Sequence, residues 1–265
     1  MLAPIPSIAA HSKGSSFRFP MRLLPKKQRE AMFTLYALCR TMDNAIDDAP
    51  NAETRLKALG YWREQVAAMA TGKATDPVAV AFQPVMATYT IPLQHLEALL
   101  AGLAMDCTTQ TLICRTPADL ERYCYGVAGT VGLMSLCIFG VSGAEAESFA
   151  VELGHALQLT NILRDQHDDA KAGRTYIPPE WSKETLAVKA RGHFLAADAK
   201  ARFLPPHLIA PALAMRDVYA YYYLTLKARG WQWPGGKISL SPWQKTRIVL
   251  RSAMYYLEKF KPVEI

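Results

Sequence analysis

Apolar residues recur along most of the chain with the period of an α-helix. In the segment 25–48 they stand three or four positions apart, a spacing that places them on one helix face. Those positions are Met32, Leu35, Leu38, Met42 and Ile46. No stretch shows the strict alternation that is typical of a half-buried strand. The pattern therefore predicts an all-α fold, a bundle of about eight or more helices.

Turn and capping residues set the expected helix ends. Pro25 suits a first helical turn, Asn51 can cap the next helix, and Gly72 can end it. Ser142, with an acid three residues later, can open the longest helix, which Gly173 can close. The expected helices cover 25–48, 51–72, 78–89, 93–106, 118–139, 142–173, 185–202, 208–229 and 243–260. We expect one helical domain over 15–265 after an N-terminal arm, 1–14.

Composition narrows the class of protein. A chain of 265 residues that is 51% hydrophobic can bury one large core. The net charge of +7 fits nucleic acid, anionic lipid or an anionic substrate, but no Lys/Arg tract exceeds two residues, so we do not expect nucleic-acid binding. Five scattered cysteines without a C-x-x-C pair indicate reduced thiols and a cytoplasmic protein. No signal-peptide pattern opens the sequence.

The most apolar run of the chain covers 127–141. It is short and rich in Gly, Ser and Thr, which favours a buried core helix over a membrane span. A peripheral contact with a membrane is a separate expectation, because a basic protein that handles an apolar substrate would benefit from one.

One stretch concentrates polar chemistry inside an apolar helix. Gln158, Asn161, Asp165 and Asp169 follow one another at spacings of three, four and four, so their side chains share a helix face. Buried carboxylates need a partner, and oxygen ligands of this kind suit Mg²⁺. Arg164 adds a fixed positive charge that can hold a phosphate.

The same arrangement occurs a second time. Arg40, Asp43 and Asp47 lie on one face of the first long helix. A single D-x-x-x-D pair is common on solvated helices, but two pairs can face each other across a bundle core. Metal ions between such helices would bridge to a diphosphate.

Four motifs in this order resemble the squalene/phytoene synthase family over roughly 12–231. They are S-S-F at 15–17, Y-C-Y-G-V-A-G-T-V-G at 123–132, N-I-L-R-D at 161–165 and G-R-x-Y-x-P at 173–178. The G-S-S-F start and the short length resemble the bacterial branch that forms presqualene diphosphate. The chain departs from the family pattern at Asn44 and Asp168, which leaves both D-x-x-x-D pairs intact. It also departs at Arg18, Pro20 and Arg22, where the family usually has aromatic or apolar residues, so the resemblance does not predict the shape of the flap over the pocket.

The resemblance implies an isoprenoid synthase bundle with a central cavity. It implies a prenyltransferase of squalene and hopanoid biosynthesis that joins two farnesyl diphosphates head to head with Mg²⁺. The implied metal ligands are Asp43, Asp47, Asn161, Asp165 and Asp169. The four acids and Tyr123 are the implied catalytic residues. The implied substrate contacts are Ser16, Phe17, Tyr36, Arg40, Val127, Ala128, Gly132, Gln158, Asn161, Arg164, Arg174, Tyr176 and Tyr219.

Two groups of these residues also have ordinary structural interpretations. Gly126, Ala128, Gly129 and Gly132 make one helix thin, either for close packing or to leave room for a prenyl chain. The tyrosines can be plain core residues, or their rings can stabilise a passing carbocation.

Several alternatives remain open at this point. A relative with the same motifs could form phytoene, dehydrosqualene or squalene instead. A non-catalytic assembly protein or a lipid-binding module on the same fold would not need both acidic pairs. The sequence leaves open the proton acceptor, the use of NADPH, the chain length of the substrate and the oligomeric state.

Overall fold

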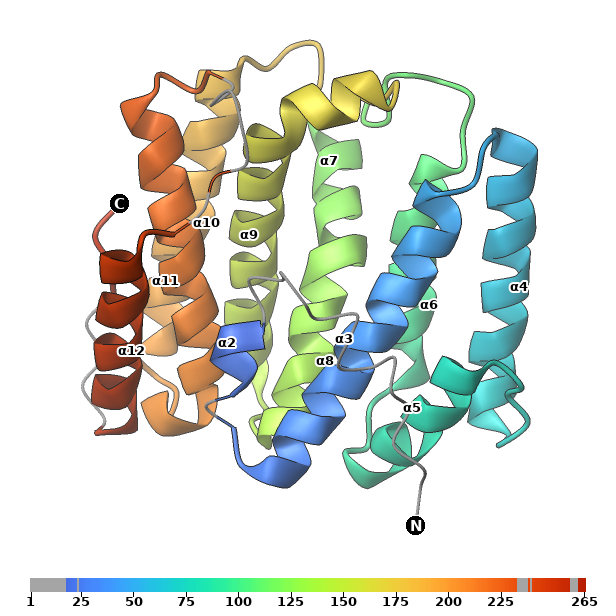
Figure 1. The fold of residues 1–265 in the computed structure, drawn as a ribbon, viewed down its shortest axis with the longest axis horizontal. Coiled ribbons are helices and arrows are strands. Elements are labelled where there is room, and N and C mark those ends of the chain that lie inside the picture. Colours follow the sequence, from blue (N-terminus) through green and yellow to red (C-terminus); the bar gives the residue numbers. More distant parts are fainter. Residues whose placement is uncertain (1–17, 23, 233–237, 239, 258–261) are drawn as a thin grey trace.

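The computed structural model describes residues 18–22, 24–232, 238, 240–257 and 262–265, which form helices joined by short connections (Figure 1). The α-helices are α2 (Arg18–Met21), α3 (Lys26–Asp47), α4 (Ala52–Ala70), α5 (Pro77–Thr88), α6 (Leu93–Leu103), α7 (Pro117–Cys124), α8 (Thr130–Phe139), α9 (Ala144–Lys171), α10 (Lys183–Ala201), α11 (Pro206–Ala228) and α12 (Pro242–Tyr256). In these ranges the only extended pairing is a single bridge between Leu112 and Thr175. The all-α prediction is confirmed.

Most predicted helix ends agree with the structure to within a few residues, and the two described next differ by two and four residues. The helix expected from Ser142 begins at Ala144, because Gly143 holds the N-cap position with φ 107°, a backbone conformation that favours glycine. The helix expected to reach 260 ends at Tyr256, and Leu257 forms its C-terminal cap.

The predicted helix 118–139 is interrupted in its middle. The backbone widens to a π-helical turn, η2 (Tyr125–Gly129), between α7 and α8. A separate short 3₁₀ turn, η1 (Ala104–Asp106), follows α6. The Thr130 N–H bonds to the Tyr125 carbonyl, five residues back. Periodicity could not reveal this turn, because the small residues around it fit an α-helical pattern equally well.

The α7–η2–α8 segment lies in the centre of the bundle and packs against α6 on one side and α9 on the other (Figure 1). Within the described residues, Pro117–Phe139 is the one helical run long and apolar enough to cross a membrane, with a mean hydropathy of 1.2. Its neighbours cover more than half of it, 56%. The prediction of a buried core helix for this region is therefore confirmed.

Glycines let the helix backbones touch around this central segment. A Cβ atom on Gly126 would lie 2.7 Å from the Cα of Gly102, and one on Gly154 would lie 2.7 Å from the backbone nitrogen of Gly129. A Cβ on Gly132 would lie 2.8 Å from the Ala150 carbonyl. Real Cβ atoms do not approach backbone this closely, so these glycines serve helix packing.

The buried apolar side chains form two clusters, and the central segment contributes residues to both. The first lies mainly between α3, α4, α5, α6 and α8, and the second between α7, α9, α10 and α11. Val127 and Leu157 are half-buried and pack against both clusters. They mark the region where the two halves of the core meet.

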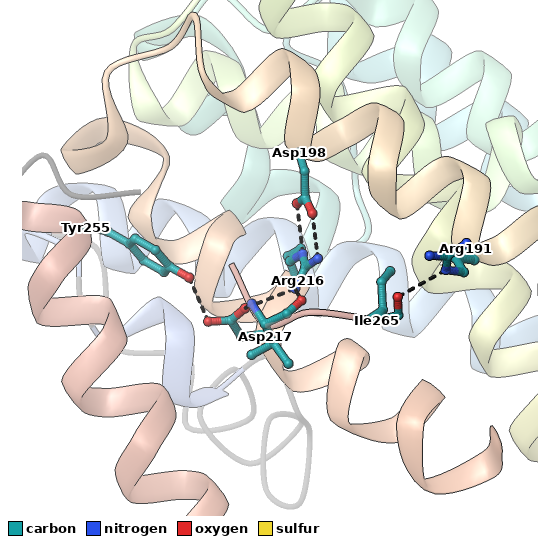
Figure 2. Close-up of polar contacts among 7 residues, drawn as sticks. Arg191, Asp198, Arg216, Asp217, Tyr255 and Ile265 are labelled. Atoms are coloured by element: carbon teal, nitrogen blue, oxygen red, sulfur yellow. Dashed lines mark hydrogen bonds and ion pairs between the residues drawn. The ribbon is translucent and has the colours of Figure 1, made fainter. Parts of the chain in front are cut away.

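A buried ionic network joins the last helices (Figure 2). The Arg216 guanidinium, 1% exposed, donates to both carboxylate oxygens of Asp198 at 2.9 and 2.6 Å and to the Val263 carbonyl at 2.5 Å. Asp217 accepts a hydrogen bond from the Tyr255 hydroxyl at 2.7 Å. The network therefore connects α10, α11, α12 and the C-terminal residues.

Candidate active site

The acidic motif of α3 stands at the C-terminal end of that helix, where the apolar face gives way to solvent. The Arg40 guanidinium donates to Asp43 at 2.7 Å. Burial and the neighbouring Asp47 carboxylate raise the pKa of Asp43 to about 6, although Arg40 opposes the shift. The negative charge on this face is therefore only partly compensated by the protein.

The acidic motif of α9 is built in the same way. Arg164 holds Asp165 through two hydrogen bonds of 2.7 and 2.5 Å. Burial and the Asp165 charge raise the pKa of Asp169 to about 7. Ile162 and Leu163 pack into the core, which fixes the rotation of α9 and directs the two acids away from it.

The structure brings both motifs to one place. The helices α3 and α9 both end at the upper edge of the bundle in Figure 1. The Arg174 guanidinium, which follows α9, donates to Asp47 of α3 at 2.5 Å. The Asp47 charge also contributes to the raised pKa of Asp169. Four carboxylates from two helices therefore share one electrostatic environment.

The donor set of this region suits a hard cation. Within the part of the chain that the structure describes, no group donates to the buried Asn161 Oδ1, while the amide nitrogen of Asn161 donates to Gln158 at 3.3 Å. Among the described residues no three His, Cys, Asp or Glu side chains converge closely enough to hold a metal alone. Mg²⁺ commonly takes one or two carboxylates, waters and substrate phosphates, so carboxylate pairs of this kind fit it.

Aromatic side chains line the α11 side of the acidic region. Tyr219 is buried, and while burial raises its pKa, the Arg164 charge and hydrogen bonding to Asn161 lower it. The Arg164 guanidinium carbon lies 5.6 Å from the centroid of the Tyr222 ring. Tyr219 therefore lies next to Arg164 and Asn161 of the second acidic motif.

A second aromatic group surrounds a carboxylate that sequence reasoning missed. The Tyr176 hydroxyl donates to Asp106 at 2.7 Å, and the Tyr123 ring stacks on Tyr176 with 4.9 Å between centroids. Asp106 is buried, and burial raises its pKa to about 6 although the Tyr176 hydrogen bond lowers it. Its only sequence signal is an acid in the last turn of an apolar helix, where the helix dipole disfavours it.

Backbone pairing holds Tyr176 in this position. Thr175 donates from its N–H to the Thr111 carbonyl at 2.7 Å and accepts from the Ile113 N–H at 2.9 Å. The segment after α9 is thereby fixed to the segment before α7. Arg174 and Tyr176 stand on either side of Thr175, and this pairing therefore positions both the Arg174–Asp47 ion pair and the Tyr176–Asp106 hydrogen bond.

The remaining candidates occupy different places. Tyr36 is half-buried on α3 and packs against the first apolar cluster. Val127 and Ala128 are half-buried on η2, and Gly132 meets the α9 backbone. Ser16 and Phe17 lie outside the described residues.

Comparisons with known proteins agree on the family. A family model described as squalene/phytoene synthase matches residues 10–188. The presqualene diphosphate synthase of Rhodopseudomonas palustris is 35% identical over 94% of this chain and 98% of its own. The phytoene synthase of Pseudescherichia vulneris is 32% identical over 81% of this chain and 79% of its own.

A solved structure has the same fold. A dehydrosqualene synthase crystallised with a ligand aligns with a TM-score of 0.79 over 95% of both chains, at 24% identity. Together with the two facing acidic motifs, these matches show that the chain belongs to the squalene/phytoene synthase family.

Proposed function

We propose that this protein joins two farnesyl diphosphates head to head and releases one diphosphate, with presqualene diphosphate as the product. The observation that carries the proposal is the pair of facing Arg and D-x-x-x-D motifs, linked by the Arg174–Asp47 ion pair. The similarity to presqualene diphosphate synthases over nearly the whole chain supports this branch of the family.

The diphosphate end of the substrate fits the acidic region through metal ions. Asp43 and Asp47 would hold Mg²⁺ on one side, and Asp165, Asp169 and Asn161 on the other. Bound Mg²⁺ supplies charge neutralisation for the leaving diphosphate. No described residue accepts a hydrogen bond from the buried Arg174 Nε, which makes this nitrogen a further donor to an anion.

The buried tyrosines can stabilise a carbocation without reacting with it. Burial raises the pKa of Tyr123 and Tyr176 well above the ordinary value, so both remain neutral at physiological pH. A neutral aromatic ring attracts a cation through its electron-rich face. Burial also excludes water, which would otherwise trap the cation as an alcohol.

We place the prenyl chain of the substrate along the boundary between the two apolar clusters, where residues pack against both. Val127 and Leu157 pack against both clusters and leave part of their surface uncovered, and Ala128 next to Val127 is also half-buried. Tyr123 stands on α7 just before η2, and α9 carries Leu157 together with the second acidic motif. An allylic cation at the acidic end would then meet the double bond of the second prenyl chain. The departing diphosphate can accept the proton whose loss closes the cyclopropane ring.

The second candidate is a synthase of the same family that forms phytoene, dehydrosqualene or squalene. The similarity to a phytoene synthase over most of both chains favours it over unrelated activities. A non-catalytic assembly protein is disfavoured, because all four acids are present and share one site. The free cysteines support a cytoplasmic location, which we include in the proposal.

The decisive experiment is incubation of the purified protein with labelled farnesyl diphosphate and Mg²⁺, with and without NADPH, followed by product identification. Presqualene diphosphate in both reactions supports the proposal. Squalene that appears only with NADPH, or a C40 hydrocarbon preferred from geranylgeranyl diphosphate, contradicts it and favours the second candidate.

Two variants serve as controls for this assay. Asp165→Asn removes one carboxylate of the α9 pair and should reduce turnover by a factor on the order of 10³ or more. Asp168→Asn changes an exposed acid next to the pair and should leave turnover close to that of the wild type.

A further inference from the structure

The Arg164 guanidinium of α9 uses part of its hydrogen-bonding capacity inside the protein. Its Nε and one terminal nitrogen donate to the two carboxylate oxygens of Asp165 at 2.7 and 2.5 Å. Both bonds lie in the plane of the guanidinium, along one of its edges, and the group has five N–H donors in all. The side chain is 22% exposed, so a ligand in the acidic region can reach its outer edge.

Asp165 alone is a weak support for this arginine during binding. The same carboxylate belongs to the proposed metal-binding set, and an oxygen that coordinates Mg²⁺ directs its lone pair at the ion. The in-plane bonds to Arg164 weaken when that happens. An arginine side chain has several rotatable bonds, so it needs another contact to keep its orientation once the metal is bound.

Tyr222 of α11 provides a contact that does not depend on the carboxylate. The Arg164 guanidinium carbon stands over the Tyr222 ring, 5.6 Å from its centroid, and Tyr222 is buried. A cation over an aromatic face is held most strongly where both groups are desolvated. Because the ring approaches from outside the guanidinium plane, it leaves the in-plane N–H donors to an anion.

The Tyr222 ring is itself held in place by its neighbour on the helix. Tyr219 stands three positions earlier, which puts both rings on the side of α11 that faces Arg164. The two rings meet edge to face, with 5.4 Å between centroids and 71° between planes. The orientation of the aromatic face under the guanidinium is therefore fixed before any ligand arrives.

We propose that Tyr222 is a positioning residue for diphosphate, whose ring keeps the Arg164 guanidinium oriented toward the ligand while Asp165 turns to the metal. Tyr222 acts through Arg164, so it is not one of the catalytic residues. The inference rests on the proposed function in one respect, the binding of a metal-bound diphosphate at the α9 motif. It does not depend on which prenyl product is formed.

The next residue on α11 offers a matched control. Tyr223 is also buried, but it points toward α10 and the end of α11. Its ring lies 6.1 Å from that of Phe194 and 5.2 Å from that of Trp231, and its hydroxyl donates to the Ala187 carbonyl at 3.2 Å. Tyr223→Leu therefore removes a buried ring of the same size from the same helix without removing the contact to Arg164.

Titration calorimetry of the full chain with inorganic diphosphate and Mg²⁺ tests the proposal. Tyr222→Leu should bind about tenfold more weakly than the wild type, because the aromatic face is lost. Tyr222→Phe keeps that face and should bind within about twofold of the wild type. Tyr223→Leu should lower the melting temperature but bind diphosphate like the wild type.

A double-mutant cycle separates positioning from a general loss of structure. In the Arg164→Gln background, Tyr222→Leu should cause no further loss of diphosphate affinity, because its effect passes through the guanidinium. Unchanged binding by Tyr222→Leu, equal losses in Tyr222→Leu and Tyr222→Phe, or the same loss in the Arg164→Gln background would each overturn the proposal. A wild type that binds no diphosphate with Mg²⁺ would overturn it as well.

The product of the wild-type enzyme tests the proposed function separately. If the expected binding losses accompany a product other than presqualene diphosphate, the proposed function is contradicted and the role of Tyr222 is supported. If presqualene diphosphate is formed but the cycle shows no coupling between Tyr222 and Arg164, the proposed function stands and the role of Tyr222 is refuted.

Discussion

At the scale of single residues, the ionised carboxylates of the site reduce the free energy of unfolding of the protein. Burial and neighbouring negative charges raise the pKa values of Asp43 and Asp169 to about 6 and about 7. A raised carboxyl pKa means that the folded state binds protons more readily than the unfolded state. Such groups lower the stability of the metal-free protein as the pH rises from about 4 to about 7.

The variant Asp169→Asn tests this cost. Without metal, it should be more stable than the wild type at pH 8, because the repelled charge is gone. The difference should disappear below about pH 3, where the wild-type carboxyl is protonated in both states. Thermal unfolding across this pH range measures the effect, and a wild type that is more stable than the variant at pH 8 contradicts it. Turnover with Mg²⁺ should be lost at the same time.

Asp106 makes a different contribution, because it orients Tyr176. Asp106→Asn keeps an oxygen acceptor for the Tyr176 hydroxyl, whereas Asp106→Leu leaves that hydroxyl buried without one. The leucine variant should lose about 1–3 kcal/mol of unfolding free energy and on the order of 10²-fold in turnover. The asparagine variant should stay within about tenfold of wild-type turnover. Denaturant unfolding and kcat measure both, and equal losses in the two variants would show that the charge itself is required.

At the scale of elements, the central segment depends on contacts between backbones. Gly126→Ala would place a methyl group 2.7 Å from the Cα of Gly102, where no flexible side chain can yield. It should destabilise the protein by about 1–3 kcal/mol. The Cβ of Gly192→Ala on α10 would meet no atom of the described residues within 4 Å, so this variant should instead be more stable by about 0.5–1 kcal/mol. Urea unfolding of the two variants gives the comparison, and effects of the same sign would contradict the packing role.

Elements were predictable where the sequence repeats a local rule. Helical periodicity with capping residues such as Asn51 placed most helices, and the repeated spacing of Asp43–Asp47 and Asp165–Asp169 indicated a pair of acidic faces. The contacts that complete the site were not predictable. Arg174 reaches Asp47 across 127 positions, and Asp106 stands alone in the sequence, so no local spacing pointed to either.

At the scale of the whole molecule, the fold relies on a buried charge to keep its last helices together. Arg216→Met would leave Asp198 and Asp217 buried without their cation and should cost about 3–5 kcal/mol. Arg191→Met removes only an exposed hydrogen bond of 3.0 Å to the Ile265 carbonyl and should cost under about 1 kcal/mol. Calorimetry of both variants measures the difference, and similar melting temperatures would show that the network is dispensable.

The π-helical turn also constrains how the length of this chain can change. A π-helical turn takes up one extra residue inside an α-helix, so the helices on either side keep nearly the register of an uninterrupted helix. Deleting a single residue between Tyr125 and Gly129 should therefore restore a regular helix without turning α7 about its axis relative to α8. A deletion elsewhere between Tyr123 and Leu133 has no such turn to absorb it and would rotate Tyr123 by about 100° away from Tyr176. The short turn is therefore the place in this segment where the chain can lose a residue while the packed part and the part that lines the site keep their relative orientation.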